Sequence, residues 1–346
     1  MSTRADGPDA TPLTPLEAAL ALLARHLDAI EPKSVAVSKA LGLVVAADVI
    51  APAAQPATAI ALIDGVAVAS ADTVGAGPYA PALPSRPPVR VAAGDALPQG
   101  CDAVLPAGAV LREGPVTLLL AEAAPGLGIR RPGEDLTAGA VILRAGHRLD
   151  PLRMGLAAAC GIGAVAVRVP HLVIEGHPGD TPVGVFIDAA LRKAGAVPML
   201  PGSAIDSADL ILAADFATGD DRLADRLALR PGEAGGIAMR GDTVVLRLPA
   251  RLEEAVAIWH ALVIPALERL TATGPVETQS RPLARKLASA VGVCDTVLLA
   301  ASGDAWHPVA IGDLPWSALA RAEAVALTEA GSEGAPAGSL FAAGLL

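Results

Sequence analysis

Near the middle of the chain an apolar segment runs directly into a glycine-rich loop, and this stretch decides the fold. It reads Leu172-Val173-Ile174-Glu175-Gly176-His177-Pro178-Gly179-Asp180-Thr181. Further apolar, strand-like segments follow at residues 198–200, 210–213 and 244–248, and helix-like segments at 188–194 and 253–270. This alternation predicts a three-layer α/β domain with a partly parallel sheet. Sites in such sheets gather beyond the carboxyl ends of the strands, so the loop after Glu175 is either a binding loop or a plain connection.

The residues before this domain predict one amphipathic helix and several short strands. Thr14 before Pro15 has the pattern of a capped helix start, and leucines then recur three and four residues apart as far as about Ile30. Strand-like segments lie at 34–46, 66–69, 89–92, 103–105, 116–121, 140–143 and 164–168, and a helix-like segment at 152–160. Residues 70–145 are therefore predicted to contain a small inserted β domain. Residues 271–281 read as a linker before a last, β-rich part.

Composition and charge exclude several classes of protein. Of the 346 residues, 53% are hydrophobic and 18% charged, which indicates packed cores and excludes a disordered chain. The net charge of −10 disfavours nucleic acid as a partner. Charges and glycines interrupt every long apolar stretch, so no membrane helix is predicted. Because the first residues lack an apolar leader and the three cysteines are far apart, we expect a cytoplasmic protein with Cys101, Cys160 and Cys294 as small core residues.

Two charged segments in the first half of the chain are candidate sites. Asp64 and Gly65 precede a strand, which indicates a β-turn unless the acid has a chemical role. Residues 125–135 place Arg130, Arg131, Glu134 and Asp135 in one glycine-rich loop. Guanidinium forks suit phosphate or an oxyanion such as molybdate, and carboxylates suit Mg²⁺. A turn with local ion pairs is the alternative reading of this loop.

A third candidate lies in the second half, where Arg226 and Arg230 are four residues apart. On a helix both side chains would reach one anion. The alternative is a solvated surface on which they pair with Asp221, Asp225 and Glu233. No Ser/His/Asp or Cys/His set and no zinc-binding spacing can be assembled, and the six histidines are scattered.

Taken in order, these segments resemble one family, the molybdopterin molybdenumtransferases of the bacterial MoeA and gephyrin E-domain group. Ile63-Asp64-Gly65-Val66-Ala67-Val68 is similar to the family's MDGYAV, and residues 93–105 are similar to TGAPLPEGADAVV. Residues 125–136 resemble the PGxNVRRxGEDI loop. Residues 14–17, 40–49 and 155–162 resemble a helix start, a strand and a helix of the same family.

The resemblance implies a multidomain fold of mixed α/β and β structure. An elongated N-terminal domain would comprise residues 14–50 and 140–170, with a small β domain inserted at 51–139. A three-layer α/β, molybdopterin-binding-like domain would follow at 171–274, and a C-terminal β-barrel-like domain at 275–346. The expected assembly is a homodimer in which the inserted domain of one subunit helps to complete the site of the other.

The resemblance also implies the last step of molybdenum cofactor assembly, in which adenylylated molybdopterin is hydrolysed with Mg²⁺ and molybdate is inserted. Asp64 and Asp135 match the acidic residues, and would be catalytic and hold the metal. The expected cofactor-binding residues are Arg130, Arg131, Asp180, Arg226 and Arg230. A molybdoenzyme or another protein of the pathway is the further expected partner.

Several family motifs are altered in the α/β domain. Thr181 replaces a glutamate, and Asp215-Phe216 replaces part of a paired-glycine loop that lets backbone N–H groups approach a phosphate. Residues 248–254 lose a glycine and an asparagine, and the segment between Leu200 and Leu210 is short. The sequence thus leaves an active molybdenumtransferase, a catalytically silent binding or assembly factor, and a binder of another anionic small molecule as alternatives.

Overall fold

A computed structural model describes residues 12–199 and 208–346, and the chain divides into two compact units. The larger one, here the α/β unit, comprises Met1–Ala47, Ala145–Pro151 and Ala164–Leu346. The smaller one, here the inserted unit, comprises Asp48–Arg144 and Leu152–Gly163. The finer division into four domains stays a prediction.

The α/β unit is built on a six-stranded sheet with the order β14-β13-β15-β19-β18-β16. Four neighbouring strands are parallel: β14 (Val197–Met199), β13 (His171–Glu175), β15 (Leu210–Ala213) and β19 (Thr243–Arg247). The last two, β18 (Gly236–Arg240) and β16 (Asp221–Ala224), are antiparallel. The predicted partly parallel sheet is confirmed; Leu200, predicted to end one strand, lies outside the described residues.

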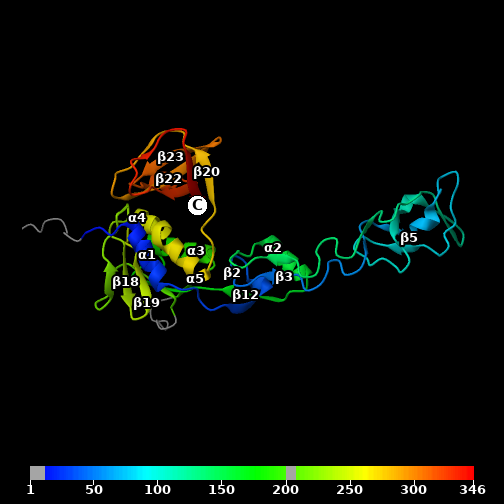
Figure 1. The fold of residues 1–346 in the computed structure, drawn as a ribbon, viewed down its shortest axis with the longest axis horizontal. Helices are drawn as coiled ribbons and strands as arrows, with labels where there is room; N and C mark the ends of the chain where they lie inside the picture. Colours follow the sequence, from blue (N-terminus) through cyan, green and yellow to red (C-terminus); the bar gives the residue numbers. More distant parts are fainter. Residues whose placement is uncertain (1–11, 200–207) are drawn as a thin grey trace, which may run out of the picture. The chain divides into compact units, whose positions relative to one another are not determined.

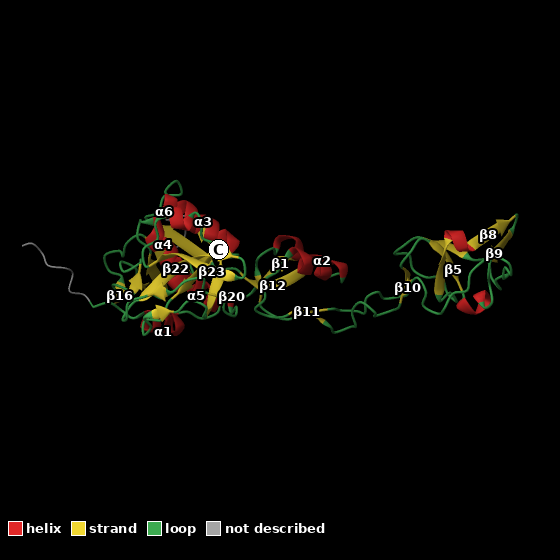
Figure 2. Ribbon diagram, turned by 90° about the horizontal axis from the view of Figure 1, so that it is seen from above, coloured by secondary structure: helices red, strands yellow, loops and turns green. Residues whose placement is uncertain are grey.

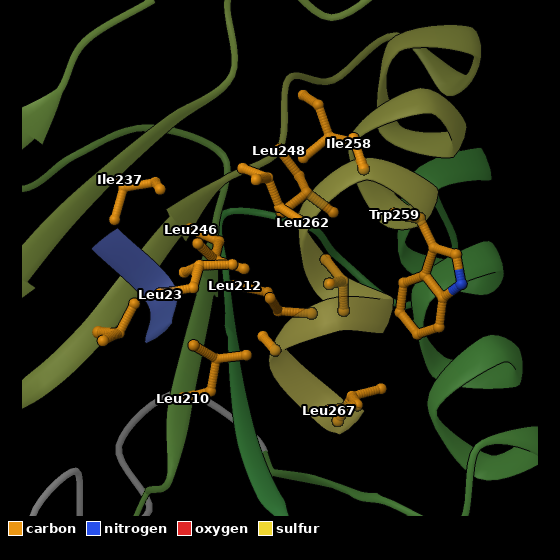
Figure 3. Close-up of a cluster of buried hydrophobic side chains, with 14 of the residues drawn as sticks. Leu23, Leu210, Leu212, Ile237, Leu246, Leu248, Ile258, Trp259, Leu262 and Leu267 are labelled. Carbon is orange, nitrogen blue, oxygen red and sulfur yellow. The ribbon is translucent and has the colours of Figure 1, made fainter. Parts of the chain in front are cut away.

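The helices of this unit pack on one face of the sheet. They are α1 (Leu16–His26), α3 (Pro182–Lys193), α4 (Leu252–Ile258), a π-helical turn (Trp259–Val263) and α5 (Ile264–Thr271). Alternate strand residues such as Leu172, Leu212 and Leu246 point into this layer and are fully buried. Figure 3 shows Leu212 and Leu246 between Leu23 of α1 on one side and Leu262 and Leu267 on the other. The predicted long helix at 253–270 is thus one helical segment with a π turn in its middle.

On the opposite face of the sheet, the described residues do not form the predicted third layer. Val173, Ile211 and Val245 form a small cluster there with Phe216, and no helix of residues 12–199 or 208–346 contributes to it. One reason within the described residues is the connection after β15, which spans only residues 214–220 and is too short to hold a packed helix.

Two helix starts differ from the sequence prediction. Thr14 does not cap α1, because its backbone pairs with Arg226 and Ala228 as an isolated bridge, and Pro15 takes the cap position without a side-chain bond. The helix also ends at His26 rather than near Ile30. By contrast, α3 begins earlier than predicted. The Thr181 hydroxyl accepts the Gly184 N–H at 3.1 Å, and Pro182 starts the helix.

The end of the α/β unit is the β-rich part that the sequence predicts. Its main strands are β20 (Thr278–Pro282), β22 (Cys294–Ser302), β23 (Ala305–Ile311), β24 (Ala324–Leu327) and β26 (Leu340–Leu345). The order β23-β22-β24-β26-β20 closes where Leu283 pairs with Trp306. Smaller elements are β21 (Leu287–Ala288), β25 (Gly334–Ala335) and α6 (Trp316–Leu319). Figure 1 shows β20, β22 and β23 together at the orange and red end of the chain.

Two details of this part escape sequence analysis. The predicted linker at 271–281 is partly wrong, because Thr278–Pro282 pairs with β26. A strand from the middle of the chain, β17 (Leu229–Arg230), pairs in parallel with β22.

A third, small sheet joins β1 (Lys33–Ala36) and β2 (Val44–Val45) to β12 (Ala164–Arg168), with a 3₁₀ turn at Val37–Lys39.

The inserted unit consists of short strand pairs around a small apolar core. Strand β5 (Gly65–Val68) lies between β6 (Val89–Val91) and β7 (Ala103–Pro106), and β8 (Val110–Glu113) forms a hairpin with β9 (Val116–Leu119). Figure 2 shows this hairpin beside β5. The other elements are β3 (Val49–Ile50) with β11 (Val141–Leu143), β4 (Ile60–Ala61) with β10 (Ile129–Arg130), 3₁₀ turns at Ser70–Thr73 and Ala107–Ala109, and α2 (Pro151–Ala159).

The cysteines are free thiols. Cys160 and Cys294 are buried as predicted, whereas Cys101 is half-buried. Within the described ranges, no helix combines the length and apolarity that a membrane crossing needs.

Candidate functional site

The inserted unit brings three of the quoted sequence motifs together. Strands β4 and β10 pair through Ala61 and Ile129, and the Leu62 N–H donates to the Gly128 carbonyl at 2.8 Å, so the Asp64 turn lies beside the 125–136 loop. The Ala93 N–H donates to Asp64 Oδ1 at 2.8 Å, which ties the third motif to the same turn. The unit therefore positions Asp64 between the loops at residues 93–95 and 125–136.

Asp64 is exposed, and only one of its two carboxylate oxygens accepts a hydrogen bond. Its Oδ1 accepts the Ala93 N–H, and its Oδ2 has no hydrogen bond to any described residue. The neighbouring Gly65 cannot carry a side chain, because a Cβ there would lie 2.2 Å from the Leu105 carbonyl oxygen. The turn is thus held rigidly by close backbone packing, while its carboxylate stays available to solvent.

The basic pair and the second acid lie farther along the same loop. Arg130 and Asp135 form an ion pair at 2.7 Å, with 41% and 43% of their side chains exposed. The backbone N–H of Asp135 donates to the Gln55 carbonyl at 3.0 Å, so this end of the loop is tied to a different segment from Asp64. The Arg131 N–H donates to Glu134 at 2.7 Å.

These acids do not by themselves form a magnesium site. Asp135 is neutralised by Arg130, and nothing in the structure brings it into contact with Asp64. Across residues 12–199 and 208–346 there is no group of three or more acidic, histidine or cysteine side chains that could hold a metal ion. A hard divalent cation needs several oxygen ligands, so the part of the chain that the structure describes offers too few in one place.

The α/β unit carries a cavity of about 640 Å³ at the carboxyl end of β13. Its walls come from the loop after β13, the first turns of α3 and the neighbouring strand β14. The lining residues are Ile174, Gly176, His177, Pro178, Gly179, Gly184, Val185, Asp188, Ala189, Arg192, Pro198 and Met199. The predicted binding loop therefore does line a cavity of the size that small ligands occupy.

Glycines let the walls of this cavity approach one another. A Cβ at Gly184 would lie 2.0 Å from the Pro178 carbonyl oxygen, so the start of α3 packs directly on the loop. Gly176 has a φ of +71°, and a Cβ there would meet the Ala214 Cβ at 2.7 Å. Asp180 is exposed and does not line the cavity, and Thr181 acts as the helix cap.

His177 joins two of the loops at this edge of the sheet. Its Nε2 donates to the Leu248 carbonyl at 2.8 Å, which links the loop after β13 to the end of β19. Burial lowers the pKa of His177, and the hydrogen bond to the carbonyl only partly opposes this effect. The ring is therefore neutral near pH 7 and has a structural part in shaping the cavity.

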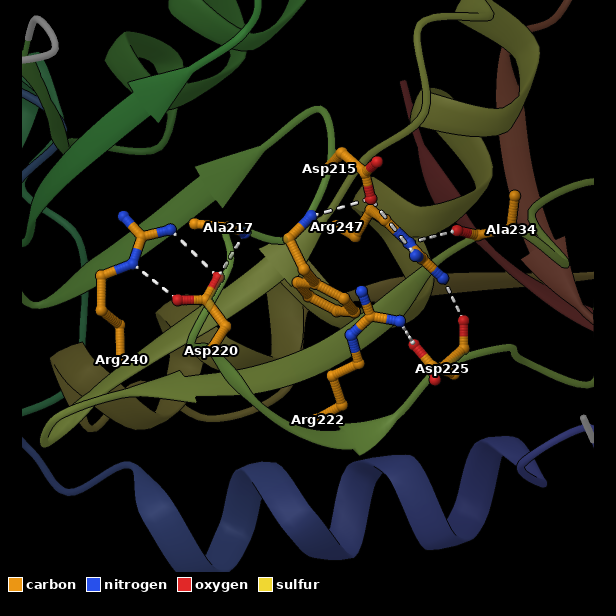
Figure 4. A network of polar contacts seen from close by, with 9 residues as sticks. Asp215, Ala217, Asp220, Arg222, Asp225, Ala234, Arg240 and Arg247 are labelled. Carbon is orange, nitrogen blue, oxygen red and sulfur yellow. Dashed lines mark hydrogen bonds and ion pairs between the residues drawn. The ribbon is translucent and has the colours of Figure 1, made fainter.

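Asp215 does not point into the cavity. Its carboxylate accepts the N–H of Phe216 at 2.8 Å and faces Arg247 at 3.4 Å, and 80% of the side chain is exposed. The guanidinium of Arg247 stacks on the Phe216 ring at 4.6 Å and donates to the carbonyls of Ala234 and Asp225. Figure 4 shows this network, in which each charge is compensated locally.

A second network lies beside it on the same face of the sheet. Arg240 donates to both oxygens of Asp220 and of Glu175, at 2.8 to 3.0 Å. The hydrogen bond from Arg240 holds the pKa of Asp220 below its usual range, although burial opposes this. Arg240 thus uses its donors within the chain and does not line the cavity.

Arg226 and Arg230 are not on a helix, which removes the spacing argument for a shared anion. Arg230 belongs to β17 and binds Asp295 through two bonds of 2.8 and 2.9 Å. Arg226 pairs with Glu233, as the surface alternative expected. Asp295 is fully buried; burial acts to raise its pKa, but the bonds from Arg230 and Ser289 outweigh this and lower it. These arginines serve the packing of the strands.

Sequence reasoning missed the charged residues that do line the cavity. Arg192 donates to Asp188 at 2.8 and 3.0 Å, one helical turn apart on α3. The signal was present, since an acid and an arginine four residues apart follow the glycine-rich loop within one helix. Because the helix was expected to begin only at Asp188, the two residues were not connected with the loop.

Comparison with known proteins places these features in one family. The family model of the MoeA N-terminal region (domains I and II) matches residues 14–161. Molybdopterin molybdenumtransferase 2 of Mycobacterium tuberculosis is 28% identical over 312 residues, with 71% of this chain and 77% of the relative covered. The molybdopterin molybdenumtransferase of Haemophilus influenzae is 31% identical over 140 residues, which are 37% of this chain and 35% of the relative.

Solved structures agree at the level of the fold. The molybdopterin biosynthesis MoeA protein of Pyrococcus horikoshii superimposes with a TM-score of 0.74 at 22% identity, covering 97% of this chain and 100% of the other. A molybdenum cofactor biosynthesis protein of Pyrococcus furiosus gives a TM-score of 0.60 at 19% identity, with 97% and 100% covered. The matched N-terminal region, the curated relatives and the shared fold together support a MoeA-family member.

Proposed function

We propose that this protein acts in molybdenum cofactor biosynthesis and binds molybdopterin in the cavity after β13. The observation that carries the proposal is the position of this cavity in a MoeA-family chain, at the carboxyl edge of the parallel strands. Its relatives in Mycobacterium tuberculosis and Haemophilus influenzae are named molybdopterin molybdenumtransferases. The specific reaction that we propose is insertion of molybdate into adenylylated molybdopterin.

Binding would rest on a small number of groups around the cavity. Arg192 offers the cation among the lining residues, and the start of α3 offers the positive end of a helix dipole. Gly176 and Gly184 keep side chains out of the space beside the loop. Neutral His177 holds the loop in place without adding charge.

The acids of the inserted unit are the proposed catalytic residues, in a homodimer. Asp64 presents an unbonded carboxylate oxygen, and the Arg130–Asp135 pair is exposed enough to rearrange around a substrate. Because the described residues of one chain offer too few ligands for Mg²⁺ in one place, a magnesium site is proposed only where a second subunit completes it. We further propose a cytoplasmic location and delivery of the product to a molybdoenzyme or another protein of the pathway.

Calorimetric titration of the purified protein with molybdopterin tests the binding site. We expect micromolar or tighter binding, weakened at least tenfold by Arg192→Glu, because this change leaves two acids beside the cavity. The matched control is Arg25→Glu, an exposed arginine in the last turn of α1 that does not line the cavity. Equal weakening by both variants, or no binding by the folded wild type, would refute the proposal.

A catalytically silent binding or assembly factor is the second candidate. It is favoured by the arginines after β16, which are engaged with Glu233 and Asp295 rather than directed to a ligand. The absence of a three-ligand metal cluster among the described residues favours it as well. An assay of cofactor formation from adenylylated molybdopterin, Mg²⁺ and molybdate separates the two. Turnover that disappears in Asp64→Asn supports the enzyme, and binding without turnover supports the silent factor.

A further inference from the structure

A second cavity, of about 520 Å³, lies against the other flank of α3 within the same unit. Both cavities touch the exposed ridge of Val185 and Ala189. Gly184, Asp188 and Arg192 face the cavity already described, whereas Phe186, Ala190 and Lys193 face this one. The two spaces are therefore separate and can be changed independently by substitutions on one helix.

The walls of the second cavity are mainly apolar and aromatic. Phe186 and Trp259 meet edge to face, with ring centroids 5.7 Å apart and an interplanar angle of 75°. Ile264 and Leu267 of α5 continue the apolar wall. Figure 3 shows Trp259 at the border of the main core, with its ring directed toward α3. Such a wall suits the apolar body of a small molecule.

The backbone is irregular where this cavity is formed. The helix that runs from Leu252 to Thr271 contains a π turn at Trp259–Val263, and the first two side chains of that turn, Trp259 and His260, line the cavity. π turns are rare inside α-helices and occur frequently at functional sites. The irregularity therefore coincides with the cavity and with the residues that present polar groups to it.

Some of the polar side chains at this cavity are hydrogen-bonded to other residues of the chain, and others are not. Arg148 donates to the carbonyls of Gly42 and Ala194, and Glu268 accepts the N–H of Val276 at 2.9 Å. The side chains of Lys193 and His260 have neither an ion pair nor a hydrogen bond with any residue of the described ranges. Lys193 lies close enough to His260 to act on it electrostatically. An ammonium group and a neutral imidazole are thus left together at the rim of an apolar cavity.

A smaller cavity of about 260 Å³ adjoins the second one. His260, Ile264, Val276 and Leu345 line both. The remaining walls of the smaller cavity come from β20, β24 and β26, including Thr278, Val325 and Leu327. An elongated apolar group could therefore extend from Phe186 past His260 toward these strands.

We propose that the cavity between α3 and the π turn binds a small organic monoanion, such as a medium-chain or aromatic carboxylate. The apolar body lies against Phe186, Trp259 and Leu267, and the carboxylate accepts hydrogen bonds from Lys193. No bond is formed or broken in this step. The site is independent of molybdopterin binding, because the charged residues of the two cavities lie on opposite flanks of α3.

Calorimetric titration of the full-length protein with decanoate tests this proposal, with decan-1-ol as the uncharged counterpart. We expect one decanoate per chain and at least about fivefold weaker binding in Lys193→Met, which removes the charge but keeps the length of the side chain. Ala190→Trp, which fills the cavity from α3, should abolish binding. The matched control is Lys286→Met, at an exposed lysine that lines neither cavity.

Thermal unfolding and light scattering of each variant accompany the titrations. Binding that is lost in the folded Ala190→Trp variant and weakened in Lys193→Met, but not in Lys286→Met, supports the site. The proposal is overturned if folded wild-type protein binds no decanoate at millimolar concentration, or if all variants bind alike. It is also overturned if the wild type is a dimer that binds no decanoate and Ala190→Trp dissociates this dimer. The face beside α3 is then an interface between two copies of the chain.

Discussion

The two units hold their charged side chains in different ways. In the α/β unit, Arg230 is bonded to an Asp295 that is 0% exposed, and Arg240 closes on two acids at once. In the inserted unit, Arg130 and Asp135 form an ion pair with more than 40% of each side chain exposed. Asp64 accepts one hydrogen bond, from a backbone N–H. The same residue types thus serve packing in one unit and remain accessible in the other. Burial, rather than residue identity, separates structural charges from candidate catalytic ones.

The largest effect should come from breaking the pair between Arg230 and the buried Asp295. We expect Arg230→Ala to lower the free energy of unfolding by on the order of 3 kcal/mol, because it leaves the Asp295 carboxylate buried without its cation. Arg130→Ala, the same change in the inserted unit, should lower it by less than about 1 kcal/mol. Urea unfolding of both variants measures the difference, and equal losses would contradict the comparison.

The buried His260 makes the stability of the α/β unit depend on pH. Burial, aided by Lys193, lowers the pKa of His260 to about 4. The unfolded chain takes up this proton near pH 6.5, so the native state loses stability as the pH falls from about 6.5 to 4. His260→Gln should remove on the order of 2–3 kcal/mol of that loss. Unfolding midpoints at pH 7 and pH 4 test it; an identical pH dependence in wild type and variant would show that His260 titrates normally.

The Arg247 contacts should have an intermediate effect. Arg247→Met keeps an apolar side chain over Phe216 but removes the cation and its bonds to two carbonyls. We expect a loss of about 1–2 kcal/mol in the free energy of unfolding. Arg222→Met is the comparison, because Arg222 lies farther from the same ring, at 5.8 Å, and is more exposed. A larger loss in Arg222→Met than in Arg247→Met would argue against the network as described.

The smallest effect on stability, and the clearest effect on chemistry, is expected at Asp64. Asp64→Asn keeps the bond from the Ala93 N–H, so the free energy of unfolding should change by less than about 0.5 kcal/mol. Cofactor formation should fall by about a hundredfold or more if the carboxylate acts on the substrate. Chemical denaturation and the turnover assay, run on the same preparation, give both values. A variant that unfolds easily would instead make Asp64 a structural residue.

Much of the fold could be predicted because strands and helices alternate with clear apolar patterns. The strand segments at 210–213 and 244–248 and the long helix after them are examples. The wrong prediction of a third layer could not be avoided from the apolar pattern alone. The short connection after β15 becomes informative only once the strand order is known. Thr14 has the sequence of a cap, but its backbone is used by a strand-like bridge to residues more than 200 positions later.

The candidate site was predicted less completely, for a similar reason. The partner of Arg230 is 65 residues away and reaches it only through the pairing of β17 with β22. Asp215 differs from the family motif in sequence. In the structure its carboxylate accepts the N–H of Phe216 and pairs with Arg247, and it does not enter the cavity. The loop after β13 was identified because its glycines and its place after an apolar strand are local features.

The most direct test of the central claim is the titration of molybdopterin into wild type, Arg192→Glu and Arg25→Glu. The cavity beside α3 predicts binding that weakens at least tenfold in Arg192→Glu and stays unchanged in Arg25→Glu. Binding of equal strength in all three folded proteins would contradict the account, because the pterin would then be held somewhere other than the carboxyl edge of this sheet.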